Sequence, residues 1–413
     1  MKKRFLKLLV TVCLLAAALP KCLDALGLPP LSEWRSYADL FSTESAEVWT
    51  ANCNEFISLR PQTDSAENLA KIPVGASMKL LGWDGRYARV SYEGLEGYVM
   101  SSYIKPKNAA GFRADLPTVP LTSTYTYERM QKDLKKLGEE FPDSLTVSSI
   151  GKSEEGRKLS VLRIGSENAG HHVLLQGSIH GREHMTAWLL TAMADYWLRN
   201  DISRYGDVCF HIIPMSNPDG VTISQTGKTG QAQEDIYQAD LKSGRTTLSR
   251  EEYAAHWKSN ATGTDLNCNF PAGWEEVNGR PAPSCQDYAG ESPFSAAETQ
   301  ALRDYTKAYA FDATVSYHVS GSLIYWEYGT DEGVNRASRS LAQTVGKTTG
   351  YPTMGAEGVS GAGYKDWAIG ELGIPSLTIE AGCQEAPLAE RELYSIFARN
   401  RMVLPEIARW VQK

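Results

Sequence analysis

Residues 180–183 read His-Gly-Arg-Glu, so the imidazole of His180 and the carboxylate of Glu183 stand three positions apart. The apolar run Val173–Leu175 precedes them and predicts a buried strand, and residues 185–190 predict the first turns of a helix. At a turn from strand to helix, side chains at i and i+3 can converge on one point. A nitrogen and an oxygen ligand at one point suit zinc, which for catalysis needs a third protein ligand and an open position. Such a pair is also common on solvated surfaces, so the rest of the chain has to supply further ligands.

Two later segments end in side chains of the same kinds. One strand-like run ends at His318 and another ends at Glu380, while residues 264–270 read Thr-Asp-Leu-Asn-Cys-Asn-Phe. This order and spacing resemble the zinc carboxypeptidase family, and the resemblance extends from Tyr125 to the C-terminus. Further matching segments are residues 125–128, 150–157 and 217–220. The resemblance implies an α/β fold, with a mixed central sheet flanked by helices, and a zinc-dependent peptidase.

The same resemblance assigns roles to these residues. His180, Glu183 and His318 would bind zinc and leave one position for water, whose pKa the metal lowers to about 7. Glu380 would be the general base that takes a proton from this water and passes it to the leaving nitrogen. The alternatives are a buried histidine bonded to backbone at 318 and a structural ion pair at 380, because a buried carboxylate needs a partner.

Three charged residues complete the expected site. Arg182 matches one of the family's arginines, and Lys258 stands where the family has the arginine that stabilises the oxyanion. Lysine keeps the positive charge but lacks the planar fork of arginine. Asp265 would orient a histidine ligand from behind. Taken singly, each of these residues is also typical of a solvated face.

The expected substrate-binding residues depart from the family pattern. The family holds the terminal carboxylate of its substrate with an asparagine and an arginine, whereas this chain has Asn267 followed by Cys268. A thiol cannot replace the bidentate fork of arginine. The mobile tyrosine of the family is also missing from its place, near Gly358, and Tyr364 or Tyr351 are the candidate substitutes.

Lys365 falls at the position that lines the family's pocket for the side chain after the cut. A lysine there predicts an acidic group on the substrate; the alternative is a surface lysine that points away. Exported bacterial members joined to wall-binding modules include γ-D-glutamyl-diaminopimelate peptidases, and the extra carboxylate of diaminopimelate would suit Lys365. The resemblance therefore implies cleavage of peptidoglycan stem peptides. A carboxypeptidase acting on free peptides and a non-catalytic wall-binding protein are the alternatives.

The N-terminal part differs from the rest in its pattern of apolar and charged residues. Residues 1–25 carry basic residues and then an apolar run of about a dozen, which is shorter than a membrane span and predicts a secretory signal rather than an anchor. In residues 46–106, short apolar strands alternate with turns, which predicts a small all-β barrel resembling a bacterial SH3-like domain. That domain would bind the cell wall or serve as a spacer. Residues 107–120 are the expected linker, and 121–413 the catalytic domain, in which strands and helices alternate.

Composition limits the partners. The chain has 413 residues and a net charge of -7, which argues against a nucleic-acid partner. A monomer is expected, secreted and associated with the cell wall. The seven cysteines define no disulfide framework, and Cys209 lies in an apolar strand where a core residue is expected.

Overall fold

The computed structural model describes residues 49–84, 86–107, 116–119, 122, 124–355 and 363–413. The predicted signal (residues 1–25) and most of the predicted linker lie outside the described residues. Among the described residues, none of the helices combines the length and the apolar character needed to cross a membrane. The chain divides into two compact units, of which the larger contains residues 124–355 and 363–413.

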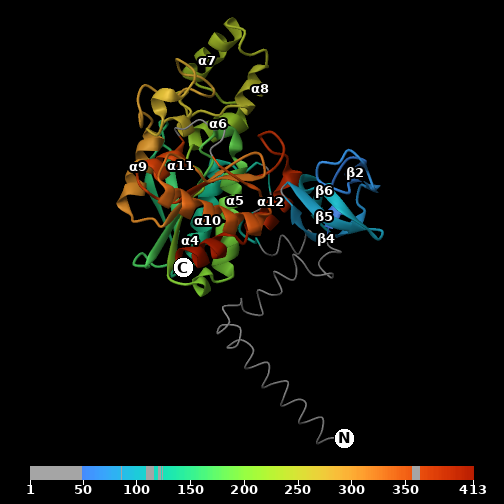
Figure 1. Cartoon of the computed structure of the whole chain (residues 1–413). Coiled ribbons are helices and arrows are strands. Elements are labelled where there is room, and N and C mark those ends of the chain that lie inside the picture. Colours follow the sequence, from blue (N-terminus) through green and yellow to red (C-terminus); the bar gives the residue numbers. More distant parts are fainter. Residues whose placement is uncertain (1–48, 85, 108–115, 120–121, 123, 356–362) are drawn as a thin grey trace, which may run out of the picture. The chain divides into compact units, whose positions relative to one another are not determined.

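The larger unit is built on an eight-stranded mixed sheet, in the order β14-β13-β15-β12-β10-β11-β9-β8. Helices of the same unit lie around this sheet in Figure 1. The four central strands β11, β10, β12 and β15 are parallel, and β8, β9 and β13 pair antiparallel. The central strands are buried along almost their whole length, as expected for parallel strands covered on both faces. The strands are β8 (Leu145–Lys152), β9 (Lys158–Ile164), β10 (His171–Gly177), β11 (Val208–Ile213), β12 (Ala313–His318), β13 (Leu323–Tyr325), β14 (Thr353–Met354) and β15 (Ser376–Glu380).

Helices cover both faces of this sheet. Leu174 of β10 packs in one hydrophobic cluster with Leu302 of α9 and Trp367 of α11. Gly177 has the opposite orientation on β10 and borders Leu190 of α5. The helices are α4 (Tyr127–Glu140), α5 (Met185–Arg199), α6 (Pro218–Thr226), α7 (Gln231–Lys242), α8 (Arg250–Ala255), α9 (Ala297–Ala308), α10 (Glu332–Thr349), α11 (Tyr364–Gly370), α12 (Leu393–Asn400) and α13 (Val403–Val411).

The smaller unit is all-β. Its strands form a sheet in the order β6-β5-β4-β1-β7 and a separate β2-β3 hairpin, with antiparallel pairing between β1 and β4 and between β2 and β3. Inward side chains such as Leu59, Ile72 and Val90 are fully buried. The strands are β1 (Trp49–Ala51), β2 (Phe56–Leu59), β3 (Ala70–Pro73), β4 (Ser77–Asp84), β5 (Tyr87–Tyr92), β6 (Leu95–Met100) and β7 (Ile104–Pro106).

The predicted fold class is confirmed: a mixed sheet flanked by helices follows an all-β region of antiparallel strands. The short strands β13 and β14 were not expected, because two or three residues carry too little periodicity to be recognised. The exact domain boundaries stay a prediction.

Candidate active site

The structure brings His180, Glu183 and His318 together at the ends of β10 and β12. His180 Nδ1 lies 2.7 Å from Glu183 Oε1, and His318 Nδ1 lies 3.1 Å from Glu183 Oε2. The two Nδ1 atoms are 3.2 Å apart. All three side chains are buried, so they form a compact group of potential metal ligands.

The turn after β10 places the first two ligands. Ser178 has a φ of 49°, and its backbone N–H donates to Thr186 Oγ1 at 2.6 Å, which ties the end of the strand to the start of α5. A Cβ on Gly181 would lie 2.5 Å from the backbone of Gly220, so only glycine permits this close approach. The Gly181 N–H also donates to the carbonyl of Lys258. The His-Gly-Arg-Glu segment is therefore held by backbone contacts that its own sequence allows.

The surroundings of His180 fit a cation. Asp265 Oδ1 lies 3.2 Å from His180 Nε2, so this nitrogen carries the proton and Nδ1 presents a lone pair. That lone pair faces both His318 Nδ1 and the Glu183 carboxylate. These electron-rich atoms repel one another unless a positive ion lies between them. Two imidazoles and one carboxylate are the ligand set of many catalytic zinc sites. The residues present therefore fit zinc.

Glu380 lies beside these ligands, because β15 pairs in parallel with β12 so that Glu380 stands opposite His318. Burial raises the pKa of the Glu380 carboxyl to about 7, and the negative charge of Glu183 adds to this rise, while His318 and Lys258 oppose it. A carboxyl with such a pKa can both accept and return a proton near neutral pH, as a general base must.

Two cations adjoin the ligands. Lys258 Nζ lies 3.1 Å from Asp265 Oδ2, and although burial opposes its charge, Asp265 and Glu183 raise the pKa of Lys258 above its ordinary value. The Nε of Arg182 is buried and has no hydrogen-bond partner among the described residues. Lys258 is therefore a fixed charge beside the ligands, and the role of Arg182 stays a prediction.

Replacing Lys258 by alanine is expected to lower kcat by about 10²–10³-fold with a smaller change in KM, since the charge of Lys258 is predicted to act on the oxyanion. Lys258→Arg should retain more activity than Lys258→Ala because it keeps the charge. Steady-state kinetics on a cleavable peptide measure both, with Lys307→Ala, an exposed lysine of α9, as the control. A rise in KM of that size with an unchanged kcat would show that Lys258 only binds substrate.

The predicted substrate-binding residues are placed less favourably. Asn267 accepts a hydrogen bond from the Tyr364 N–H at 3.1 Å. The Tyr364 side chain is fully buried, and its hydroxyl is bonded to Thr306. Lys365 is also buried, and its Nζ donates to Asp366 and to the carbonyl of Glu327. The contacts of Tyr364 and Lys365 with substrate stay predictions, and this packing does not support them.

Two other positions complete the comparison with the expected site. Burial raises the pKa of the Cys268 thiol, so this side chain is neutral where the family has an arginine. Tyr351 is buried, and its hydroxyl accepts a hydrogen bond from Asn400. Gly358 lies outside the described residues.

Asp287 is a site residue that the sequence did not indicate. Its backbone N–H donates to Asp265 Oδ2, and its carboxylate lies 3.9 Å from Lys258 Nζ. It lies in irregular backbone far from any recognisable motif, so only the folded loop brings it to Lys258. Asp287 thereby helps to hold the side chains of Asp265 and Lys258 in position.

Glu298 of α9 supports the loop that carries Lys258 and Asp265. Its carboxylate accepts from the Glu154 N–H at 3.2 Å and from Asn260 Nδ2 at 3.1 Å. Asn260 Oδ1 in turn accepts from the N–H groups of Thr262 and Thr264. This buried carboxylate is thus one of the anchors of the loop.

Glu298 predicts a pH dependence of stability. Burial raises its pKa from 4.5 to about 7. Between these two pH values Glu298 is therefore protonated in the folded chain and ionised in the unfolded chain. The contribution of Glu298 to stability is therefore greatest below pH 4.5 and falls as the pH rises to about 7. Between pH 5 and 7.5, the free energy of unfolding measured in urea should fall by about 2 kcal/mol more for the wild type than for Glu298→Gln. Parallel pH profiles for the two proteins would contradict this account.

Comparisons with known proteins agree with this geometry. The sequence profile of the family described as "Zinc carboxypeptidase" matches residues 130–406. Gamma-D-glutamyl-L-diamino acid endopeptidase 1 of Lysinibacillus sphaericus is 30% identical over 288 residues, which are 66% of this chain and 69% of that protein. Carboxypeptidase B of Homo sapiens is 26% identical over 64% of this chain and 68% of its own length.

The fold is also that of solved structures. Bovine thrombin-activatable fibrinolysis inhibitor, in complex with tick carboxypeptidase inhibitor, matches with a TM-score of 0.53 and 21% identity. The match covers 70% of this chain and 97% of the bovine one. At this level of identity the likeness shows the shared fold.

Proposed function

The chain belongs to the zinc carboxypeptidase family, and from this premise we propose that it is an exported zinc peptidase that cleaves peptidoglycan stem peptides at the γ-D-glutamyl-diaminopimelate bond. The convergence of His180, Glu183 and His318, with Glu380 opposite His318, supports a metallopeptidase. A relative named as a gamma-D-glutamyl-L-diamino acid endopeptidase supports the choice of bond.

The site residues divide the work of hydrolysis. Zinc, when bound by His180, Glu183 and His318, polarises the scissile carbonyl and makes water nucleophilic at neutral pH. Glu380 accepts the proton and returns it to the departing nitrogen. Lys258 supplies a fixed positive charge for the oxyanion, and Asp265 keeps His180 in the tautomer that leaves Nδ1 free.

The observation that carries the choice of substrate is Cys268. It stands where the family has the arginine of the carboxylate clamp, and its buried thiol is neutral. Asn267, the other half of the clamp, has its Oδ1 bonded to the backbone of Tyr364. Without a bidentate cation, the site gains little from a free α-carboxylate next to the bond, which favours cleavage within a stem peptide.

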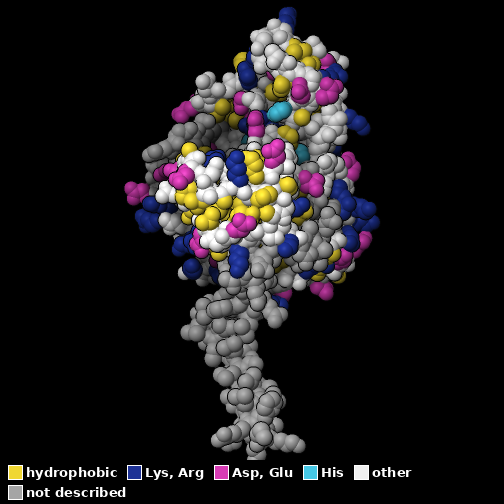
Figure 2. Space-filling view, turned by 90° about the vertical axis from the view of Figure 1, so that its right-hand side faces the viewer, with side chains coloured by type: hydrophobic (Ala, Val, Ile, Leu, Met, Phe, Trp, Pro, Cys, Tyr) yellow, Lys and Arg dark blue, Asp and Glu magenta, His cyan; other side chains and the backbone are white. Residues whose placement is uncertain are grey.

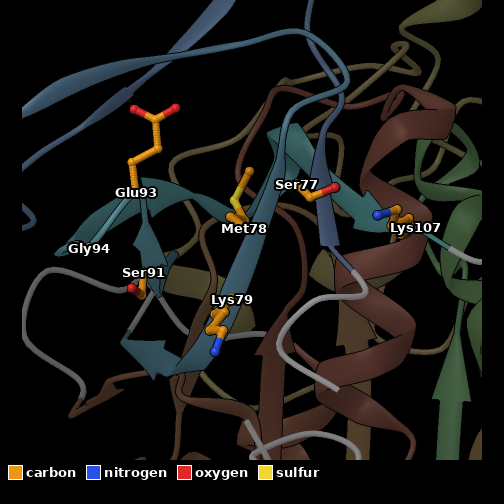
Figure 3. Close-up of a pocket in the computed structure, with 7 residues that line it drawn as sticks. All are labelled: Ser77, Met78, Lys79, Ser91, Glu93, Gly94 and Lys107. Atoms are coloured by element: carbon orange, nitrogen blue, oxygen red, sulfur yellow. The ribbon is translucent and has the colours of Figure 1, made fainter. Parts of the chain in front are cut away.

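The smaller unit is proposed to attach the enzyme to the cell wall. A pocket of this unit is lined by β4, by the end of β5 and the turn that follows it, and by the residue after β7 (Figure 3). Its lining includes two amines and one carboxylate, which suit a zwitterionic peptide, and consists of Ser77, Met78, Lys79, Ser91, Glu93, Gly94 and Lys107. Hydrophobic side chains also reach the surface on the face shown in Figure 2, and Phe56, Leu69, Val74 and Leu95 are the large exposed ones of this unit.

One experiment separates the proposed activity from its two alternatives. Zinc-loaded protein is incubated with a peptidoglycan stem tetrapeptide and with an N-blocked dipeptide, and the products are identified by mass spectrometry. We expect a fragment that begins with diaminopimelate and an intact dipeptide. Release of single C-terminal amino acids from the dipeptide would indicate a carboxypeptidase. An absence of cleavage despite bound zinc would indicate a non-catalytic wall-binding protein.

A further inference from the structure

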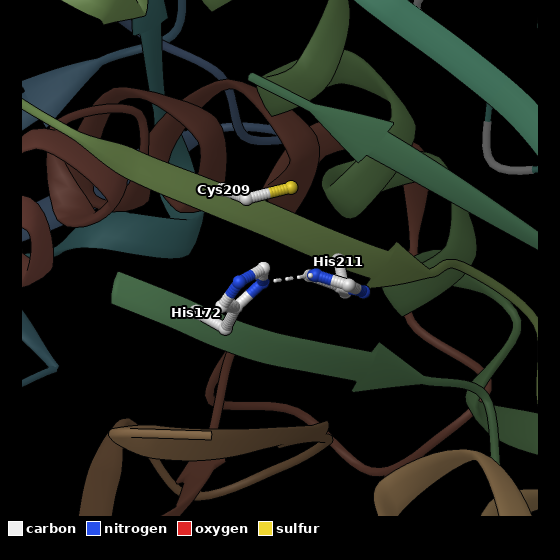
Figure 4. A group of neighbouring side chains, drawn as sticks. All are labelled: His172, Cys209 and His211. Carbon is white, nitrogen blue, oxygen red and sulfur yellow. Dashed lines mark hydrogen bonds between the residues drawn. The ribbon is translucent and has the colours of Figure 1, made fainter. Parts of the chain in front are cut away.

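A second group of potential metal ligands lies in the larger unit, outside the active site. His172 of β10 and Cys209 and His211 of β11 place one nitrogen or sulfur atom each within 4.8 Å of the others (Figure 4). The ligand atoms of His180, Glu183 and His318 likewise lie within 4.8 Å of one another. Within the described part of the chain, this is the only such group that contains a cysteine.

The sheet itself builds this group. β10 and β11 are parallel, with His172 opposite Cys209, and His211 follows two residues later on the same face. The group lies near the start of β10, whereas the catalytic ligands follow its end, about 17 Å farther along the strand. An ion at this group would therefore be distinct from the catalytic one.

Hydrogen bonds orient the two rings toward one another. His211 Nδ1 lies 2.7 Å from the hydroxyl of Tyr305, and His211 Nε2 lies 2.9 Å from His172 Nδ1. If Nδ1 of His211 holds the proton and donates it to Tyr305, its Nε2 carries a lone pair. A hydrogen bond from the far ring nitrogen to a fixed partner is the usual support of a metal-bound histidine.

We propose that His172, Cys209 and His211 form a second transition-metal site, of the zinc class, with a fourth position open to solvent. Two imidazoles and a thiolate are ligands that zinc prefers. Cys209 releases its proton to solvent on binding, and the Nδ1 proton of His172 moves to Nε2, so that both facing nitrogens turn lone pairs to the ion. His172 is only partly buried and offers the route of entry.

The two imidazole nitrogens need only a small adjustment to accept the ion, and the Cys209 sulfur lies within 4.8 Å of both. A tetrahedral zinc separates two nitrogen ligands by about 3.3 Å and a nitrogen and a sulfur by about 3.6 Å. The two nitrogens are 2.9 Å apart, so a small widening admits the metal.

The neighbouring charges are compatible with a cation. Arg163 of β9 stands opposite His211, but its guanidinium is paired with Glu167 and donates to the Tyr309 hydroxyl. The thiolate of Cys209 would neutralise half of the charge of a divalent ion. The alternative is a hydrogen-bonded histidine pair that only fills the core between β10 and β11.

Cobalt distinguishes these two possibilities, because a thiolate bound to Co²⁺ produces a charge-transfer absorption that imidazoles and carboxylates do not. The metal-free full-length chain is titrated with Co²⁺, and zinc content is measured separately after saturation and dialysis. We expect the thiolate absorption in the wild type and two zinc ions per chain. Cys209→Ser should lose the absorption and one zinc, while Cys268→Ser, which changes the thiol near the catalytic ligands, should keep both.

A third variant guards against loss of folding. His172→Gln changes the partly exposed member and should also lose one zinc while peptidase activity and circular dichroism stay within error of the wild type. The proposal does not rest on the proposed substrate, since the deciding readouts are of metal binding, and activity and circular dichroism only show that His172→Gln is folded. It is overturned if the wild type shows no thiolate absorption, if Cys209→Ser keeps it, or if the wild type holds one zinc only.

Discussion

Replacing Glu380 by glutamine is expected to lower kcat by about 10³-fold while the zinc content stays that of the wild type. Glutamine keeps the shape of the side chain but cannot accept a proton, and Glu380 is the carboxyl that stands opposite His318 with a pKa raised by burial. Because Glu380 is not among the three converging ligands, its loss should leave the metal site intact. Steady-state kinetics and metal analysis of the same preparation measure the two effects.

The matched control is Glu139→Gln, which changes an exposed glutamate of α4. It should behave as the wild type in both measurements. A Glu380→Gln protein whose rate is within a few fold of the wild type would contradict the assignment of the base. Loss of zinc from that variant would instead make Glu380 a ligand.

Replacing His318 by alanine is expected to abolish activity and to weaken zinc binding. The loss of affinity should exceed the roughly 10–100-fold that follows the loss of a residue hydrogen-bonded to a metal ligand. The variant removes one of three ligands and leaves Glu183 with a single imidazole partner. Treatment with a chelator should inactivate the wild type in the same way, and added zinc should restore only the wild type. Activity after dialysis against chelator and after zinc addition is the measurement.

His256→Ala is the control for His318→Ala. This histidine follows the last residue of α8, its Nδ1 lies 2.7 Å from the Glu252 carbonyl oxygen, and it belongs to neither group of potential metal ligands. It should keep full activity and normal recovery with zinc. If His318→Ala recovered activity as the wild type does, the three-ligand site would be wrong.

Much of the fold followed from the sequence because the central strands are buried and strongly apolar. The strand-like run expected to end at His318 appears as Ala313–His318, and the strand predicted from Val173–Leu175 appears as His171–Gly177. The order of His180, Glu183, His318 and Glu380 along the chain was also enough to predict their roles. A shared motif fixes such residues at the ends of strands, which meet at one edge of a sheet.

The orientation of individual side chains could not be predicted in the same way. Lys365 was expected to face the substrate, but as the second residue of α11 it is turned inward to Asp366 and the Glu327 carbonyl. An alignment gives the position of a residue and not the direction of its side chain.

The group of His172, Cys209 and His211 was equally invisible in the sequence. Cys209 was read as a core residue, and its nearness to His172 depends on the parallel pairing of β10 with β11. Parallel strands joined by a long crossover carry no local signal of their register.

The central claim is that His180, Glu183 and His318 hold one catalytic zinc, and anomalous diffraction at the zinc edge tests it most directly. Crystals of the zinc-loaded chain should show a peak within about 2.0–2.2 Å of both Nδ1 atoms and of a Glu183 oxygen. A zinc-saturated, active crystal in which these three side chains bind no metal would contradict the account.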